Sequence, residues 1–185
     1  MRHLLTGLSV VVLLAYPFAI YFGIEKFGLS ILGGILAVFF VLRIFTAGQT
    51  KLKEFKQLAI ISGLVGITLI VLGVLFRSNG WLLFYPVVVN ACMLMVFASS
   101  LKQPQTIIER LARLQEPDLP KSGVQYTRKV TQVWCLFFLF NGITALYTCF
   151  LPIEIWTFYN GLISYILIGA LFAIEWVVRQ IVRKD

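Results

Sequence analysis

The chain has 185 residues, of which 59% are hydrophobic and only 13% are charged, whereas about a quarter of residues are charged in soluble domains. This composition, with a mean hydropathy of +0.90, predicts an all-α integral membrane protein. The net charge of +8 indicates membrane orientation and lipid contact and argues against a nucleic-acid partner, because the Lys and Arg residues lie in short segments between apolar runs.

A helical span needs about 20 apolar residues, and six runs along the chain approach that length. The predicted spans cover residues 4–24, 28–46, 57–76, 81–101, 131–151 and 155–178. The turns at 25–28, 77–80 and 152–154 are very short, so they pair the spans into three hairpins. Because Pro17 and Glu25 interrupt the first hairpin, five spans are the alternative. The first run is longer than the apolar core of a signal peptide, so we expect it to be retained.

The basic residues are divided unevenly between the two ends of these hairpins. Fourteen of the 16 belong to the N-terminus, to the segments between hairpins or to the C-terminus, and only Lys26 and Arg77 lie in the other turns. By the positive-inside rule, both termini and the loop over residues 102–130 are cytoplasmic.

The second and third hairpins share a pattern of Gln, Gly-Ile-Thr, Trp and Tyr. It occurs at Gln57, Gly66-Ile67-Thr68, Trp81 and Tyr85, and again at Gln132, Gly142-Ile143-Thr144, Trp156 and Tyr159. The two hairpins are either parallel repeats, as in some transporters, or similar only because membrane helices favour these residue types.

The loop at 102–130 is a polar island in an otherwise apolar chain. Thr106 and Glu109 form a capping-box pattern, which predicts a helix start, and the prolines after Leu114 end that helix. The predicted helix at 107–114 carries apolar Ile107, Ile108, Leu111 and Leu114 together with basic Arg110 and Arg113. It is too short to span, so we expect it either to lie in the membrane interface with its arginines near anionic headgroups or only to connect two spans. The segment after it is a candidate surface for docking a partner.

Polar groups inside apolar spans are the first candidates for function, because burying them in lipid is costly. Asn90 and Asn141 fall near the middle of their spans, where two amides could hydrogen-bond between helices or contact a substrate. Arg43 and Glu175 both lie about one turn inside the cytoplasmic end of a span. They could pair with each other, or Glu175 could pair with Arg179 four residues later.

The sequence offers no pattern typical of a catalytic or metal site. The three cysteines lie in apolar runs without ligand spacing, the one histidine is His3, and Glu25 and Glu154 are isolated at the outer turns. Acyl transfer needs a nucleophile with a nearby base, and metal-dependent lipid chemistry needs clustered carboxylates. We therefore expect no metal, no cofactor and no enzymatic activity.

Several motifs resemble those of one family of bacterial membrane proteins. They are "LKQP" from Leu101, "IIERL" from Ile107, "DLP" from Asp118 and "VWCLFFLFNGITALYTCFLPIEIWTFYNG" from Val133. In these motifs the chain resembles the intracellular septation protein A family, and it is also similar to small membrane proteins encoded beside aryl-polyene biosynthesis genes. Asn141 departs from the family pattern, which has a small or apolar residue there.

The resemblance implies a location in the bacterial inner membrane and a role in cell-envelope biogenesis, and it brings no catalytic residues. We expect a non-enzymatic accessory or scaffold protein whose partners are membrane lipids and other inner-membrane proteins. The aromatic residues Trp134, Phe137, Tyr147 and Trp156 are expected to set how the helices pack and how deeply they sit. The alternative is a carrier of a lipid-like or polyene molecule.

Overall fold

The computed structural model describes residues 16–23, 31, 33–45, 47, 53–78 and 80–182, and within these residues all regular structure is helical. The labelled elements are α2 (Lys53–Leu75), α3 (Gly80–Leu83), α4 (Tyr85–Ser100), α5 (Ile107–Arg113), α6 (Lys121–Thr148), α7 (Ile153–Phe158), the π-helix η2 (Tyr159–Ile163) and α8 (Ser164–Val182). Residues 16–23 and Gly33–Phe45 are also helical.

Among the described residues, four helices are long and apolar enough to cross a membrane. They are Lys56–Leu75, Gly80–Ser100, Lys121–Thr148 and Ile153–Gln180, and they correspond to the last four of the six predicted spans. Gly33–Phe45, within the second predicted span, is apolar but shorter. The first predicted span, 4–24, lies outside the described residues except for its last part, 16–23.

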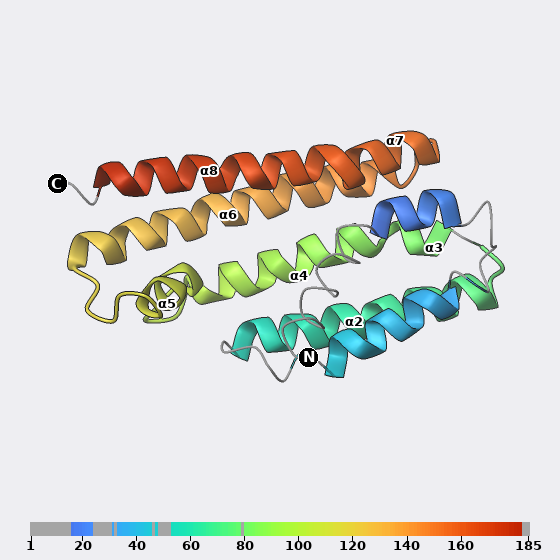
Figure 1. Ribbon diagram of the computed structural model, residues 1–185, viewed down its shortest axis with the longest axis horizontal. Coiled ribbons are helices and arrows are strands. Elements are labelled where there is room, and N and C mark those ends of the chain that lie inside the picture. Colours follow the sequence, from blue (N-terminus) through green and yellow to red (C-terminus); the bar gives the residue numbers. More distant parts are fainter. Residues whose placement is uncertain are drawn as a thin grey trace.

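The long helices form a layered bundle (Figure 1). The ribbons of α8, α6, α4 and α2 follow one another across the molecule, and Gly33–Phe45 runs beside α2. The short helix α5 is different, since it is seen almost end-on where the others run lengthwise. It therefore lies across the end of the bundle, between the end of α4 and the start of α6.

One boundary differs from the sequence prediction. The loop was expected to continue to residue 130, but α6 begins at Lys121, directly after Pro120. Val130 packs against the core formed by Phe97, Ile107, Trp134 and Phe138. Thr127, in the second turn of α6, is also buried, so the helix extends into a polar stretch that counting apolar residues alone does not detect.

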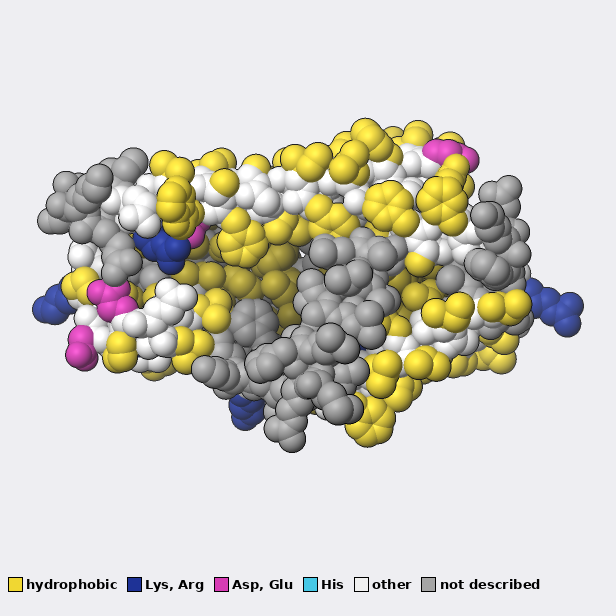
Figure 2. Space-filling view, in the orientation of Figure 1, with side chains coloured by type: hydrophobic (Ala, Val, Ile, Leu, Met, Phe, Trp, Pro, Cys, Tyr) yellow, Lys and Arg dark blue, Asp and Glu magenta, His cyan; other side chains and the backbone are white. Residues whose placement is uncertain are grey.

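The described residues form two buried apolar clusters. One, near α3 and α7, contains Tyr16, Phe40, Leu82, Tyr85 and Trp156; the other, near α5, is the cluster around Trp134. Many hydrophobic side chains are also exposed on the face shown in Figure 2. On α8 the exposed side chains include Ile166, Leu167, Phe172, Ile174, Trp176 and Val177. Soluble monomers rarely expose such continuous apolar surface, whereas lipid would cover it.

The helix between Gly80 and Ser100 is interrupted before Pro86, which gives α3 and α4. Proline has no backbone N–H and its ring displaces the carbonyl four residues earlier, which here is that of Leu82. The Tyr16 hydroxyl donates to the Leu82 carbonyl at 2.8 Å, and the Trp156 indole N–H donates to the Leu83 carbonyl at 3.1 Å. The carbonyls near this break thus accept hydrogen bonds that connect α3 to the helix at 16–23 and to α7.

Candidate functional site

Asn90 and Asn141, the two amides singled out from the sequence, meet between α4 and α6. Asn141 Nδ2 donates to Asn90 Oδ1 at 2.9 Å, and both side chains are buried. Asn90 Nδ2 in turn donates to the carbonyl of Pro86 at 2.9 Å. Gly142 allows this approach, since a Cβ at that position would lie 3.1 Å from Asn90 Cβ.

Asn141 also binds two residues that the sequence analysis did not select. The Tyr159 hydroxyl donates to Asn141 Oδ1 at 2.8 Å, and Asn141 Nδ2 lies 3.1 Å from Ser164 Oγ, to which it donates. One amide therefore joins α4, α6, η2 and α8. Its oxygen accepts one hydrogen bond and its nitrogen donates two, so both donor hydrogens are used.

The π-helix explains why Tyr159 and Ser164 reach the same amide. The backbone N–H of Ser164 bonds to the carbonyl of Tyr159, five residues earlier, so these residues lie one wide turn apart. On a regular α-helix, residues three and four apart share a face, and a pair spaced by five diverges. Insertions of this kind are frequent at functional sites.

Asn160, inside the same π-helix, makes a second buried link to α6. Its Nδ2 donates to Thr148 Oγ1 at 3.0 Å and to the Trp156 carbonyl at 2.9 Å. An amide in an apolar run was a signal available in the sequence. We name Asn90, Asn141, Tyr159 and Ser164 together the amide network.

Arg43 and Glu175 have separate partners. Arg43 Nε donates to Ser62 Oγ on α2 at 3.0 Å. Glu175 takes the other option open from the sequence, because its carboxylate lies 3.8 Å from Arg179 Nε. The Tyr126 hydroxyl also binds residue 175, at 3.0 Å from its carbonyl and 3.4 Å from its carboxylate. Tyr126 thus ties α6 to α8 at residue 175, and Arg43 belongs to a different contact.

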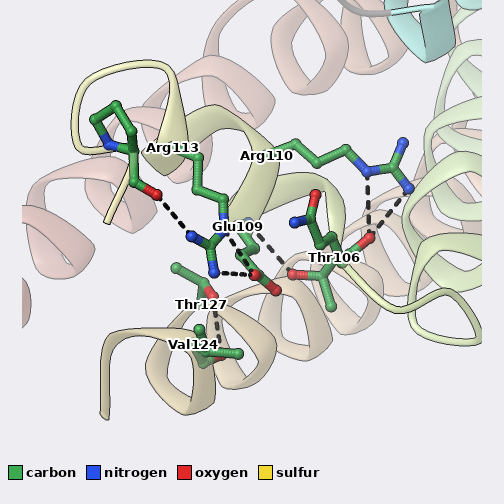
Figure 3. A network of polar contacts seen from close by, with 8 residues as sticks. Thr106, Glu109, Arg110, Arg113, Val124 and Thr127 are labelled. Atoms are coloured by element: carbon green, nitrogen blue, oxygen red, sulfur yellow. Dashed lines mark hydrogen bonds and ion pairs between the residues drawn. The ribbon is translucent and has the colours of Figure 1, made fainter. Parts of the chain in front are cut away.

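The helix predicted in the polar island is α5, and it starts where the sequence indicates. Thr106 Oγ1 accepts a hydrogen bond from the Glu109 backbone N–H at 3.3 Å, as in a capped helix start. The Glu109 carboxylate binds the Arg113 guanidinium at 2.9 Å, and Arg113 also donates to the Pro117 carbonyl at 2.7 Å. Figure 3 shows Arg113 between the carboxylate and the loop.

The second arginine of α5 holds the preceding turn. Arg110 donates to the Gln105 carbonyl through Nη2 at 3.0 Å and through Nε at 3.2 Å, and it also binds the side-chain oxygen of Gln103. Both arginines expected near lipid headgroups therefore make contacts within the loop. Whether α5 lies in a membrane interface stays a prediction.

The apolar residues of α5 divide between the core and the surface. Ile107 is 0% exposed and joins the cluster around Trp134, and Ile108 packs against that cluster. Leu111 is partly buried, whereas Leu114 is 54% exposed. The first turn of α5 is thus anchored in the bundle, and the last apolar residue of its stripe is exposed.

The four aromatic residues from the sequence analysis occupy different environments. Trp134 is buried, with ring centroids 4.7 Å from Phe172 on α8 and 5.7 Å from Phe137. Trp156 is 0% exposed, whereas Tyr147 is 64% exposed at the last turn of α6. Trp134 and Trp156 join helices, and Tyr147 faces outward.

An apolar groove lies between α2 and α4. Its volume is about 260 Å³, it is open on one side, and its walls are Leu58, Ile61, Cys92, Met95, Val96 and Ser99. No pattern in the sequence predicts this groove, because residues of common types in apolar helices line it and only packing brings them together.

Among the described residues, no group of three or more His, Cys, Asp or Glu side chains is placed to hold a metal ion. No family model, curated protein or solved structure matches the chain. The likeness to the septation protein A family therefore rests on the motifs in the sequence.

Proposed function

We propose that this chain is a multi-pass protein of the bacterial inner membrane that supports cell-envelope biogenesis as a non-enzymatic accessory or scaffold protein. The observation that carries the proposal is the use of the Asn141 amide. Its oxygen and nitrogen contact Tyr159, Asn90 and Ser164, so the most conspicuous polar group in the bundle serves to join helices. The motifs from Leu101 onward favour the envelope role.

The proposal includes six spans, with both termini in the cytoplasm. It is supported by the position of exposed lysines near one end of the bundle. Lys102 follows the end of α4, Lys121 begins α6 and Lys129 lies in its third turn, and all three are exposed. Arg77, in the turn between α2 and α3, is at the opposite end.

Deletion of the gene in its host, combined with affinity purification from native membranes, tests the proposed role. We expect an envelope defect in the deletion strain, and we expect envelope-synthesis membrane proteins to co-purify with the tagged chain. The matched control is a tagged, unrelated multi-pass protein expressed at the same level. If the purified chain alone converted a lipid or pigment precursor in liposomes, the non-enzymatic role would be wrong.

A second candidate function is carriage of a lipid-like or polyene molecule, and the groove between α2 and α4 favours it. A carrier must release its cargo, so cargo bound to purified protein should exchange with lipid vesicles. A scaffold would show no transfer of labelled lipid between donor and acceptor vesicles above that of protein-free vesicles.

A further inference from the structure

The groove between α2 and α4 is apolar and open on one side, so it can take a segment of a lipid chain. Leu58 and Ile61 line one side, and Met95 and Val96 on α4 line the other. Ile61 and Met95 are exposed, whereas Cys92 is buried and forms the floor. A flexible apolar chain seated there would contact both helices at once, and Met side chains adapt well to such a surface.

The position of the groove along the bundle indicates where the headgroup would lie. Leu58 is in the second turn of α2, and Ser99 is in the last turn of α4. The groove therefore reaches the end of the bundle at which α2 begins and α4 ends, which is the proposed cytoplasmic side.

Basic residues lie in the chain close to that end of the groove. Lys102 lies one helical turn beyond Ser99, since its backbone N–H donates to the Ser99 carbonyl at 3.2 Å. Lys53 and Lys56 lie in the first turn of α2, with Glu54 between them. All three lysines are exposed, and such clusters at the cytoplasmic surface attract anionic lipid. The positive charge of these lysines favours an anionic lipid over neutral apolar molecules of the same size.

We propose that the α2–α4 groove binds an acyl chain of an anionic phospholipid of the cytoplasmic leaflet, with the headgroup beside Lys102, Lys53 and Lys56. The inference rests on the proposed membrane location and orientation, but it does not depend on the scaffold role. Ser99, whose hydroxyl bonds the Val96 carbonyl at 3.0 Å, marks the boundary between the acyl and headgroup regions.

Photo-cross-linking of the full chain in nanodiscs tests the inference. The probe is phosphatidylglycerol with a diazirine in its acyl chain, used as a small fraction of the lipid, and mass spectrometry locates the adducts. We expect adducts to concentrate on the groove residues, above the level on exposed α8 residues such as Ile166 and Phe172. Equal labelling of the groove and α8 would overturn the proposal.

Substitutions distinguish lipid binding in the groove from lipid contact with the rest of the surface. Met95→Trp fills the groove from an exposed position and should remove most of its adducts, as should Ile61→Trp, whereas Ile166→Trp on α8 should not. The double change Lys53→Gln and Lys102→Gln should abolish the preference for phosphatidylglycerol over phosphatidylcholine carrying the same diazirine. Equal labelling of the wild type by both lipids, or protein dimers cross-linked through the groove, would contradict the proposal.

A second experiment distinguishes an incorrect lipid site from an incorrect membrane location. If the chain were not an integral membrane protein, alkaline carbonate would extract it from native membranes. A chain that resists carbonate but shows no groove adducts would refute only the lipid site.

Discussion

The side-chain amide of Asn141 on α6 donates to the side-chain oxygen of Asn90 on α4 at 2.9 Å. Tyr159 and Ser164 complete the hydrogen bonds of the same amide. Interhelical hydrogen bonds in membranes average about 0.6 kcal/mol each, so this one side chain contributes modestly through each bond but joins four elements of the bundle.

Replacing Asn141 should therefore destabilise the bundle without unfolding it. We expect Asn141→Ala to lower the free energy of unfolding by about 2 kcal/mol, because three interhelical bonds are lost and Asn90 Oδ1 loses its partner. Thr144→Ala is the matched control on α6, since the Thr144 hydroxyl bonds the Phe140 carbonyl of its own helix. Unfolding in mixed micelles measures the free energy of unfolding of the two variants and of the wild type. Equal effects of the two changes would contradict the role assigned to Asn141.

A second prediction concerns the close approach of Gly33–Phe45 to α2. A Cβ at Gly66 would lie 2.4 Å from ring atoms of the buried Phe40, whereas a Cβ at Gly169 on α8 would meet nothing within 4 Å. Gly66→Ala should cost about 1–3 kcal/mol through overpacking. Gly169→Ala should be neutral or stabilising by up to about 1 kcal/mol, because alanine favours helix.

Thermal unfolding in detergent compares the two glycine variants. A smaller side chain at position 40, as in Phe40→Leu, should reduce the cost of Gly66→Ala when the two changes are combined. If Gly66→Ala were as well tolerated as Gly169→Ala, the packing of Gly33–Phe45 on α2 would be wrong.

The third prediction concerns the ion pair in α5. The Glu109 side chain is 4% exposed and Arg113 is its cation, so Arg113→Leu leaves a buried carboxylate unpaired. We expect a loss of about 1–3 kcal/mol, together with faster proteinase K cleavage between Gln103 and Pro120. Combining Arg113→Leu with Glu109→Gln should cost less than the sum of the two single changes, because no charge then stays buried. Lys121→Leu, at an exposed position, is the control and should leave the cleavage rate unchanged.

The sequence was sufficient to find part of the site and insufficient for the rest. Asn90 and Asn141 stood out because amides are rare in such apolar helices, and their predicted depths matched. Tyr159 and Ser164 were missed because their common orientation depends on the π-helix. That element changes which residues share a face, and no composition rule predicts it. Asn160 could have been selected by the same reasoning as Asn141, because it is also an amide in an apolar run.

Predicted depth left two options open for one carboxylate. Arg43 and Glu175 were candidates for each other because both were predicted to lie about one turn inside the cytoplasmic end of a span, and Arg179 was the other candidate partner of Glu175. Equal depth does not determine which way a helix is rotated or which helices are neighbours. In the structure Arg43 contacts Ser62 on α2, whereas Glu175 lies by Tyr126 and Arg179. The existence of helices was easier to predict, since in the part of the chain that the structure describes four of the apolar runs are helices long enough to span a membrane.

A fourth prediction tests the orientation. Single cysteines introduced at Lys121 and Arg77 in a variant lacking Cys92, Cys135 and Cys149 should label from opposite sides. A membrane-impermeant maleimide should modify position 77 in intact spheroplasts and position 121 only after the membrane is opened. Labelling of position 121 from outside would reverse the proposed orientation, and labelling of both positions from outside would require a different number of spans.

The most direct test of the proposed role is complementation of a deletion strain by Asn141→Ala at matched protein abundance. If the amide network only joins helices, the variant should restore the envelope phenotype once its level in the membrane equals that of the wild type. Quantitative immunoblotting of membrane fractions sets that level, and Thr144→Ala serves as the control. Complete loss of function by Asn141→Ala at equal abundance, with Thr144→Ala unaffected, would contradict the account and indicate that Asn141 acts directly on a substrate.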